Sequence, residues 1–363
     1  MKKMLTKSLA ALMALTMVFG LSACGNSPAS GGTPAPGGTA APGGTAAPSG
    51  GGADGKVYEI RLASTQADGN DIDQTLDEFA QLCDEKSNGR LKVTVYTGNI
   101  LGDELSTTEM CQQGSLEMTL TSAGVVENFI PAYSAPSVPG IFKSYDHLQN
   151  AVNGEWGDML REVTEEAGMV LLGTTCTGFM NMGTTTPVAS FDDLKGLNIR
   201  CIESKAWSAI LSAWGANPVP MAFSEVPTSL QLGAIDGCFL APAVFVSTGI
   251  ADIMKYYTND WTVGIGLCPV MVNKDYFYSL PQDLQDVMVE AFHEAEENGF
   301  TRNKENEQKN LETMLDHGVE LVYSTPEQLA EMERINREEV WPALIELGVA
   351  TQNDIDLITS AAE

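Results

Sequence analysis

Histidines, carboxylate pairs and reactive serines are the residues most able to do chemistry, and their spacing in this 363-residue chain does not match a catalytic motif. The three histidines, His147, His293 and His317, lie far apart and outside any metal-ligand or triad-like pattern. The chain has no Gly-x-Ser-x-Gly sequence, no phosphate-cradling glycine loop and no clustered carboxylate pair with an obvious partner. We therefore expect a protein that is not an enzyme and that needs no cofactor.

The cysteines are the other candidates for metal or redox chemistry. Six of the seven are widely spaced through the body of the chain, without a Cys-x-x-Cys pair or nearby histidines, so no metal site is expected. Disulfides are an alternative, but most of these residues lie in apolar stretches, which favours free, buried thiols. The six are Cys83, Cys111, Cys176, Cys201, Cys238 and Cys268.

The N-terminal segment is predicted to be a targeting signal outside the fold. Three lysines precede an uncharged apolar run at 9–21, which is too short to span a bilayer comfortably. The run ends in Leu21-Ser22-Ala23-Cys24, which resembles a bacterial lipobox. We expect residues 1–23 to be a cleaved lipoprotein signal peptide and Cys24 to be lipidated. A plain secretory signal or an uncleaved anchor is the alternative.

A low-complexity segment follows the lipobox. Residues 24–55 are almost entirely Gly, Pro, Ala, Thr and Ser, with repeated GGTAAP-like units, and have too little apolar area to fold. They predict a disordered tether that holds the body at the outer face of the cytoplasmic membrane, at the cell surface or in a periplasm. Stable anchoring would come from two or more acyl chains.

The charge of the chain restricts its partners. It contains 20 basic and 48 acidic residues, a formal net charge of −28. Such an acidic surface argues against binding to nucleic acid or to anionic lipid. A bound anion would need a local, buried cation to outweigh the global field.

The body of the chain reads as alternating strands and helices. Strands are predicted at 58–62, 91–95, 118–121, 170–176 and 238–240, and a short strand within 195–202. Helical spacing is found at 72–83, before 113–114, after Ser204 and between 224 and 233. Ser279-Leu280-Pro281 precedes one very long helix or two in succession. The order predicts an α/β protein with mostly parallel sheets.

Several motifs together resemble one family, the substrate-binding subunits of tripartite ATP-independent periplasmic (TRAP) transporters of the dicarboxylate-binding type. Each motif is short, but they run in the expected order through most of the body. They are Gly89-Arg90-Leu91 with Val93-Thr94-Val95-Tyr96, Leu101-Gly102-Asp103-Glu104, Gln113-Gly114-Ser115-Leu116-Glu117, Asp193-Leu194-Lys195-Gly196-Leu197-Asn198-Ile199-Arg200, Gly215-Ala216-Asn217-Pro218-Val219-Pro220, Phe223-Ser224-Glu225-Val226, Leu230-Gln231-Leu232-Gly233 and Ile235-Asp236-Gly237.

The resemblance implies an α/β, two-lobed periplasmic-binding-protein-like fold with hinge-crossing strands and a long C-terminal helix. Lobe I would comprise 56–177 plus about 266–305, and lobe II 178–265 plus about 306–363. The lobes would close on a small organic acid and deliver it to TRAP membrane subunits for ion-gradient-driven uptake. Presentation of the ligand to a sensor kinase or an ABC permease is an alternative, as is an extracytoplasmic enzyme.

The family's carboxylate-binding arginine ends the Lys-Gly-Leu-x-Ile-Arg motif, which is Arg200 here. A planar guanidinium can pair both carboxylate oxygens; a structural arginine paired with an acid is the alternative. Many relatives carry a second arginine where this chain has Met180, and polar residues near the position of Leu240. These departures predict a ligand with one carboxylate and a substantially apolar body. Further ligand contacts are expected from motif position at Phe223, Ser64, Ser122, Trp261 and Asn181.

Overall fold

The computed structural model describes residues 55–362. The predicted signal peptide, the lipidation site Cys24 and all but the last residue of the predicted tether lie outside the described residues.

One mixed sheet of nine strands runs through the described part of the chain, in the order β2-β1-β3-β8-β4-β7-β5-β6, with β9 beside β8. The strands are β1 Tyr58–Ala63, β2 Leu91–Tyr96, β3 Met118–Leu120, β4 Met169–Thr184, β5 Asn198–Cys201, β6 Asn217–Pro220, β7 Gly237–Leu240, β8 Tyr256–Asn273 and β9 Glu320–Val322.

The pairing divides this sheet into two parallel groups joined by two long antiparallel strands. β1 is parallel to β2 and β3, and β5 is parallel to β6 and β7. Between the groups, β4 and β8 pair antiparallel to each other and to β7 and β3. The predicted α/β class is confirmed, while the sheet is a single mixed one and the strand predicted at 170–176 continues to Thr184.

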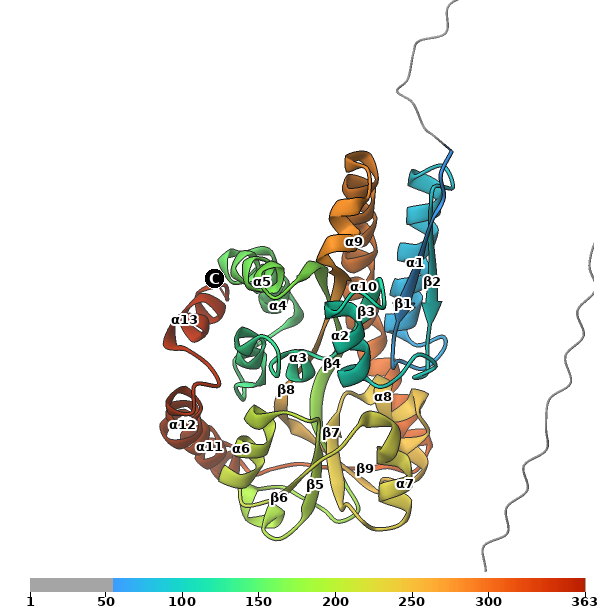
Figure 1. Cartoon of the computed structure of the whole chain (residues 1–363). Coiled ribbons are helices and arrows are strands. Elements are labelled where there is room, and N and C mark those ends of the chain that lie inside the picture. Colours follow the sequence, from blue (N-terminus) through green and yellow to red (C-terminus); the bar gives the residue numbers. More distant parts are fainter. Residues whose placement is uncertain (1–54, 363) are drawn as a thin grey trace, which may run out of the picture. The chain divides into compact units, whose positions relative to one another are not determined.

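β4 and β8 carry the chain from one group of elements to the other, as the two long ribbons in the centre of Figure 1 show. Their pairing contains four register shifts, between Leu171 and Gly183 on β4. Such bulges bend and twist a strand pair locally. The strands therefore leave the first group in one orientation and enter the second in another, and a space forms where the groups face each other.

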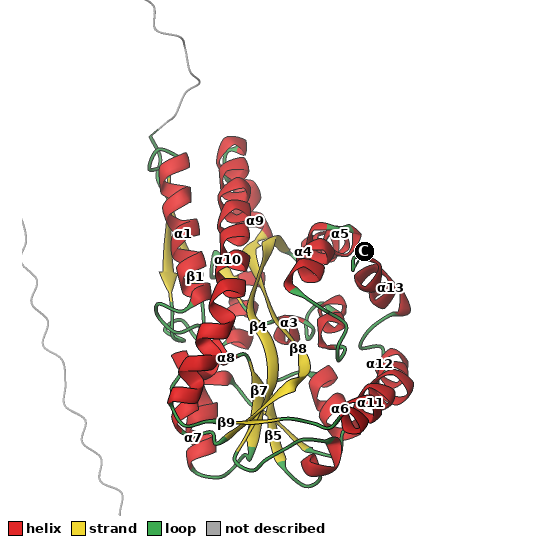
Figure 2. Cartoon of the chain, turned by 180° about the vertical axis from the view of Figure 1, so that it is seen from behind, coloured by secondary structure: helices red, strands yellow, loops and turns green. Residues whose placement is uncertain are grey.

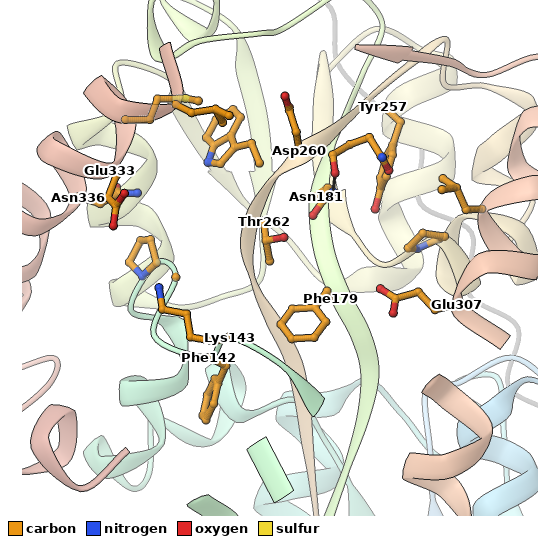
Figure 3. A pocket seen from close by; sticks show the side chains of 18 of the residues that line it. Phe142, Lys143, Phe179, Asn181, Tyr257, Asp260, Thr262, Glu307, Glu333 and Asn336 are labelled. Atoms are coloured by element: carbon orange, nitrogen blue, oxygen red, sulfur yellow. Dashed lines mark hydrogen bonds between the residues drawn. The ribbon is translucent and has the colours of Figure 1, made fainter. Parts of the chain in front are cut away.

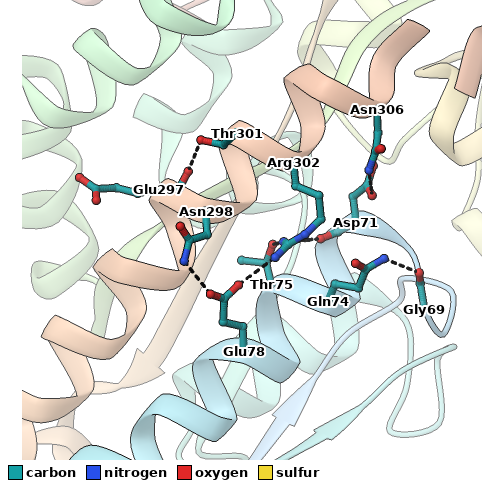
Figure 4. Close-up of polar contacts among 10 residues, drawn as sticks. All are labelled: Gly69, Asp71, Gln74, Thr75, Glu78, Glu297, Asn298, Thr301, Arg302 and Asn306. Carbon is teal, nitrogen blue, oxygen red and sulfur yellow. Dashed lines mark hydrogen bonds and ion pairs between the residues drawn. The ribbon is translucent and has the colours of Figure 1, made fainter. Parts of the chain in front are cut away.

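Two long helices cover the first group. α1 (Asp71–Lys86) and the 35-residue α10 (Gln282–Asp316) run side by side (Figures 1 and 2). The polar contacts between them are shown in Figure 4: Arg302 donates to Thr75 Oγ1 and Glu78 Oε2, both at 2.8 Å. Of the two predicted arrangements for this region, the single long helix is the one observed.

The remaining helices are shorter. They are α2 Glu104–Gln112, α3 Ala123–Val126, α4 Tyr145–Asn153, α5 Glu155–Glu166, α6 Lys205–Ala213, α7 Val226–Gln231, α8 Pro242–Ser247, α9 Lys274–Ser279, α11 Pro326–Ile335, α12 Trp341–Glu346 and α13 Gln352–Ser360. Segments of 3-10 helix lie at Pro131–Ser137, Phe191–Leu194, Phe223–Glu225 and Ile250–Asp252, and a π turn at Asn336–Val340. Ser204 caps α6 as predicted, accepting a hydrogen bond from Trp207 N.

The six body thiols are free and buried, in agreement with the favoured interpretation. Burial raises the pKa of Cys83 and of Cys111 to about 12, which keeps both in the unreactive thiol form at neutral pH. None of the helices in 55–362 combines the length and the apolar character that crossing a bilayer requires.

Candidate functional site

A cavity of about 90 Å³ lies where the two groups of elements face each other. Residues that follow β1, start α2 and form α3 line one side, and residues of β5, α6 and β7 line the other. The long strands β4 and β8 contribute Thr177, Met180 and the segment 265–268. A cavity in this position would change its volume if the two groups moved relative to each other.

Arg200 brings a buried cation to this cavity. It stands on β5, which is enclosed between β6 and β7, and only 3% of the residue is exposed. Its Nη2 donates to the carbonyl of Met221 at 3.0 Å, while Nε is buried without a partner. The guanidinium carbon lies 5.7 Å from the centre of the Phe223 ring. No ion pair holds Arg200 among the described residues.

Burial lowers the pKa of the Arg200 guanidinium, and the nearby carboxylates of Glu104 and Glu203 raise it in part. An arginine in this condition still carries its charge, because its ordinary pKa is above 12. Removing a cation from water without a paired anion is unfavourable by several kcal/mol. An anion that entered the cavity would therefore gain a preformed, dehydrated partner.

Glu104 is a second charged residue in the cavity, and the sequence interpretation did not single it out. It begins α2, directly after the cap residue Asp103, whose side chain accepts from Ser106 N. Its Oε1 accepts from Thr65 Oγ1 at 3.1 Å and its Oε2 from Ser122 Oγ at 2.6 Å. The sequence held one signal for Glu104. In the Leu101–Glu104 motif a capping residue, Asp103, is followed by an acid, and this pattern marks the start of a helix.

The rest of the lining is mainly apolar. Trp207 and Phe239 pack with their ring centres 4.4 Å apart, and Phe223, Met180 and Leu240 also line the cavity. The other apolar side chains are those of Ala123, Pro136, Ile202, Val244, Ile265, Leu267 and Cys268. Arg200 and Glu104 are the two charged residues of the lining, and its uncharged polar side chains are those of Thr65, Gln66, Ser122, Ser137 and Thr177.

Backbone from the two groups approaches closely at this cavity. Gly124 of α3 faces Ile202 and Trp207: a Cβ at this position would overlap Ile202 Cδ1 and lie 3.1 Å from its Cγ1. Glycine is therefore the residue that lets α3 pack directly against the segment after β5.

The structure brings together five of the eight predicted ligand contacts and separates three. Arg200, Phe223, Met180, Ser122 and Leu240 line the cavity. Ser64 is buried beside it, and its Oγ accepts from the backbone of Gln66. Asn181 and Trp261 line a different space.

That second space is a groove of about 630 Å³ between β4, β8, α10, α11 and the segment 139–143. Figure 3 shows Phe179 and Asn181 from β4 and Thr262 from β8 between Glu307 on one side and Lys143 and Glu333 on the other. Asn181 donates through Nδ2 to the carbonyl of Asn259 at 3.1 Å. The groove mixes charges of both signs and does not include Arg200.

A small neighbouring space has an acidic lining. It shares Arg200 and Glu104 with the cavity and adds Asp103, Glu203, Asn99 and the segment 221–222. Arg200 is its single cation.

Comparison with known proteins places this geometry in a family. The sequence profile of "Bacterial extracellular solute-binding protein, family 7" (DctP) matches residues 62–345. The C4-dicarboxylate-binding periplasmic protein DctP of Rhodobacter capsulatus is 31% identical over 260 residues, 71% of this chain and 78% of that protein. The 2,3-diketo-L-gulonate-binding periplasmic protein YiaO of Escherichia coli is 27% identical over 246 residues, 68% and 75% of the two chains.

Solved structures show the same fold. A TRAP periplasmic solute-binding protein of Shewanella oneidensis with bound succinate superposes with a TM-score of 0.80 at 23% identity, covering 85% of this chain and 100% of that one. The sugar acid binding protein DctPAm of Advenella mimigardefordensis, in complex with galactonate, gives 0.79 at 21% identity, covering 85% and 98%. These likenesses confirm the predicted two-lobed α/β architecture.

Proposed function

Because the chain belongs to the bacterial extracellular solute-binding protein family 7, the DctP-type subunits of TRAP transporters, we propose that it captures a small organic acid on Arg200. The acid would be enclosed between the two lobes and passed to TRAP membrane subunits. We keep the lobe boundaries inferred from the sequence, with the chain crossing between lobes near residues 177 and 265 and again within α10.

The buried guanidinium of Arg200 is the observation that carries this proposal. It lines the cavity between the two groups of elements, makes no ion pair in the described residues, and leaves Nε without a partner. A carboxylate fits a guanidinium well, because its two oxygens can accept two parallel, charge-assisted hydrogen bonds from the planar cation. The protein needs no catalytic group or cofactor for this task, and we propose that it is not an enzyme.

The wall of the cavity favours one carboxylate and an apolar body. Met180 and Leu240 offer no hydrogen bond to a second carboxylate or to a sugar hydroxyl, and such groups would be buried unpaired beside them, at about 1–3 kcal/mol each. Two relatives are named for ligands with more polar groups, C4-dicarboxylates and 2,3-diketo-L-gulonate. We therefore propose a monocarboxylate with a hydrocarbon side chain.

Closure of the lobes links binding to delivery. Contacts with the ligand from both lobes favour the closed form, and closure shapes the surface that the membrane subunits recognise. The lipobox at Cys24 supports a lipid anchor at the outer face of the cytoplasmic membrane. A sensor kinase or an ABC permease as recipient remains the second candidate, and the genes beside this one discriminate between them.

A thermal-shift screen of the purified chain against organic acids tests the proposal. Branched and aromatic monocarboxylates are expected to raise the melting temperature more than succinate or a uronic acid, and Arg200→Ala should abolish the shift. Stronger stabilisation by succinate or a sugar acid would refute the monocarboxylate, and a shift that Arg200→Ala leaves intact would refute the anchor.

A further inference from the structure

The cluster around Glu104 restricts the ligand beyond its carboxylate. Thr65 and Ser122 each use their single hydroxyl proton to donate to Glu104, one to each carboxylate oxygen. An ionised carboxylate has only acceptor sites, and a hydroxyl whose proton is committed can only accept. All three side chains therefore present acceptors to a ligand, and a ligand group placed there must be a donor.

The charges at the site point to a cationic donor. Arg200 and Glu104 both line the cavity without pairing directly, and the small space beside it adds Asp103 and Glu203. A simple anion bound to Arg200 would leave Glu104, which lines the same cavity, without a cationic partner. A ligand that carries an ammonium group beside its carboxylate would pair both charges.

Glu104 is held in a fixed position at the cavity. It occupies the first turn of α2, a nine-residue helix. It also accepts two hydroxyl hydrogen bonds, from elements that follow β1 and β3. The hydroxyls hold the carboxylate in place, so that it acts as a preformed partner for a cation.

We propose that the ligand is a zwitterionic amino acid with an apolar side chain, its carboxylate on Arg200 and its ammonium group on Glu104, Thr65 and Ser122. The inference rests on the proposed function, because it assumes that Arg200 binds the carboxylate. The cavity of about 90 Å³ has the volume of a few water molecules, so a branched or aromatic ligand requires the lobes to separate further than they do here.

Three ligands with one carbon skeleton test the proposal: valine, 2-hydroxyisovalerate and 3-methyl-2-oxobutanoate. They differ only in the group at the second carbon, which is an ammonium, a hydroxyl or a carbonyl without a donor. Calorimetry on the purified chain should show the amino acid binding at least about tenfold more tightly than the hydroxy acid, with the oxo acid weakest. Alanine, leucine and phenylalanine extend the series in side-chain size.

Glu104→Gln keeps the shape of the side chain and removes its charge. It should weaken amino acid binding by about 10- to 100-fold and change hydroxy acid binding little, since an amide oxygen still accepts from a hydroxyl. Glu109→Gln, an exposed acid on the same helix, is the matched control and should leave all affinities unchanged.

The outcomes separate the two proposals. The proposal of a zwitterionic ligand is wrong if an oxo acid binds as tightly as the corresponding amino acid. It is also wrong if Glu104→Gln leaves the affinity for the amino acid unchanged. If only acids without an amino group bind in an Arg200-dependent way, the proposal of a zwitterionic ligand is wrong and the proposed function holds. If no acid binds in an Arg200-dependent way, both are wrong.

Discussion

Gly124→Ala is predicted to weaken ligand binding because the added methyl group would prevent the two lobes from closing fully. Gly124 lies on α3, and a methyl group there would overlap Ile202 Cδ1, lie 3.1 Å from Ile202 Cγ1 and 3.4 Å from Trp207 Cδ1. Overpacking of this kind raises the free energy of the packed state by about 1–3 kcal/mol. If only the closed form is affected, the dissociation constant rises by about 5- to 150-fold.

The same structure predicts a rescue. Valine lacks the Cδ1 atom that the new methyl group meets, so Ile202→Val in the Gly124→Ala background should recover most of the affinity. Isothermal calorimetry measures both effects, and chemical denaturation without ligand should show little loss of stability, because the lobes can open. Unchanged binding in Gly124→Ala, or no recovery in the double variant, would refute the claim that these residues meet across a closing cleft.

Two further predictions concern the long helix α10. Burial raises the pKa of Glu296, so the folded protein binds this proton more tightly than the unfolded chain does. The protonated side chain therefore adds to the unfolding free energy below the unfolded-state pKa. That contribution is lost as the pH rises through the higher pKa of the folded state. Glu296→Gln should therefore reduce the fall in unfolding free energy between about pH 4 and pH 8, measured by urea denaturation; parallel curves would contradict this. Gly299→Ala would place a methyl group 2.6 Å from Thr75 Oγ1 and should lower the unfolding free energy by about 1–3 kcal/mol. The loss should be smaller when Thr75→Ala is made in the same protein. An unchanged unfolding free energy in Gly299→Ala would show that α1 and α10 can separate.

The elements that the sequence predicted well are those with a strong local pattern. α1 shows helical spacing from Ile72 to Cys83, and α10 begins after Leu280-Pro281, so both are defined by neighbours in the chain. Arg200 was predicted from a motif, and its place in the cavity follows from its position on a central strand. These features depend little on how distant segments meet.

What the sequence could not predict depends on register and on distant contacts. Met180 and Asn181 are neighbours on β4, but the register shift between them and the alternation of a strand send one to the cavity and the other to the second groove. Trp261 on β8 lies with Asn181 in that groove. Glu104 joins the site only because Thr65 and Ser122, from separate parts of the chain, converge on it.

The most direct test of the central claim is the affinity of the best-binding acid for the wild type, Arg200→Lys and Arg200→Ala, measured by calorimetry under one set of conditions. Breaking a buried charge pair is unfavourable by about 3–5 kcal/mol, so Arg200→Ala should weaken binding by at least about a hundredfold. The affinity of Arg200→Lys should lie between those of the wild type and Arg200→Ala, because lysine keeps the positive charge and lacks the planar guanidinium that donates two hydrogen bonds. Equal affinity in all three proteins would contradict the account and move the search for the ligand to the groove behind β4 and β8.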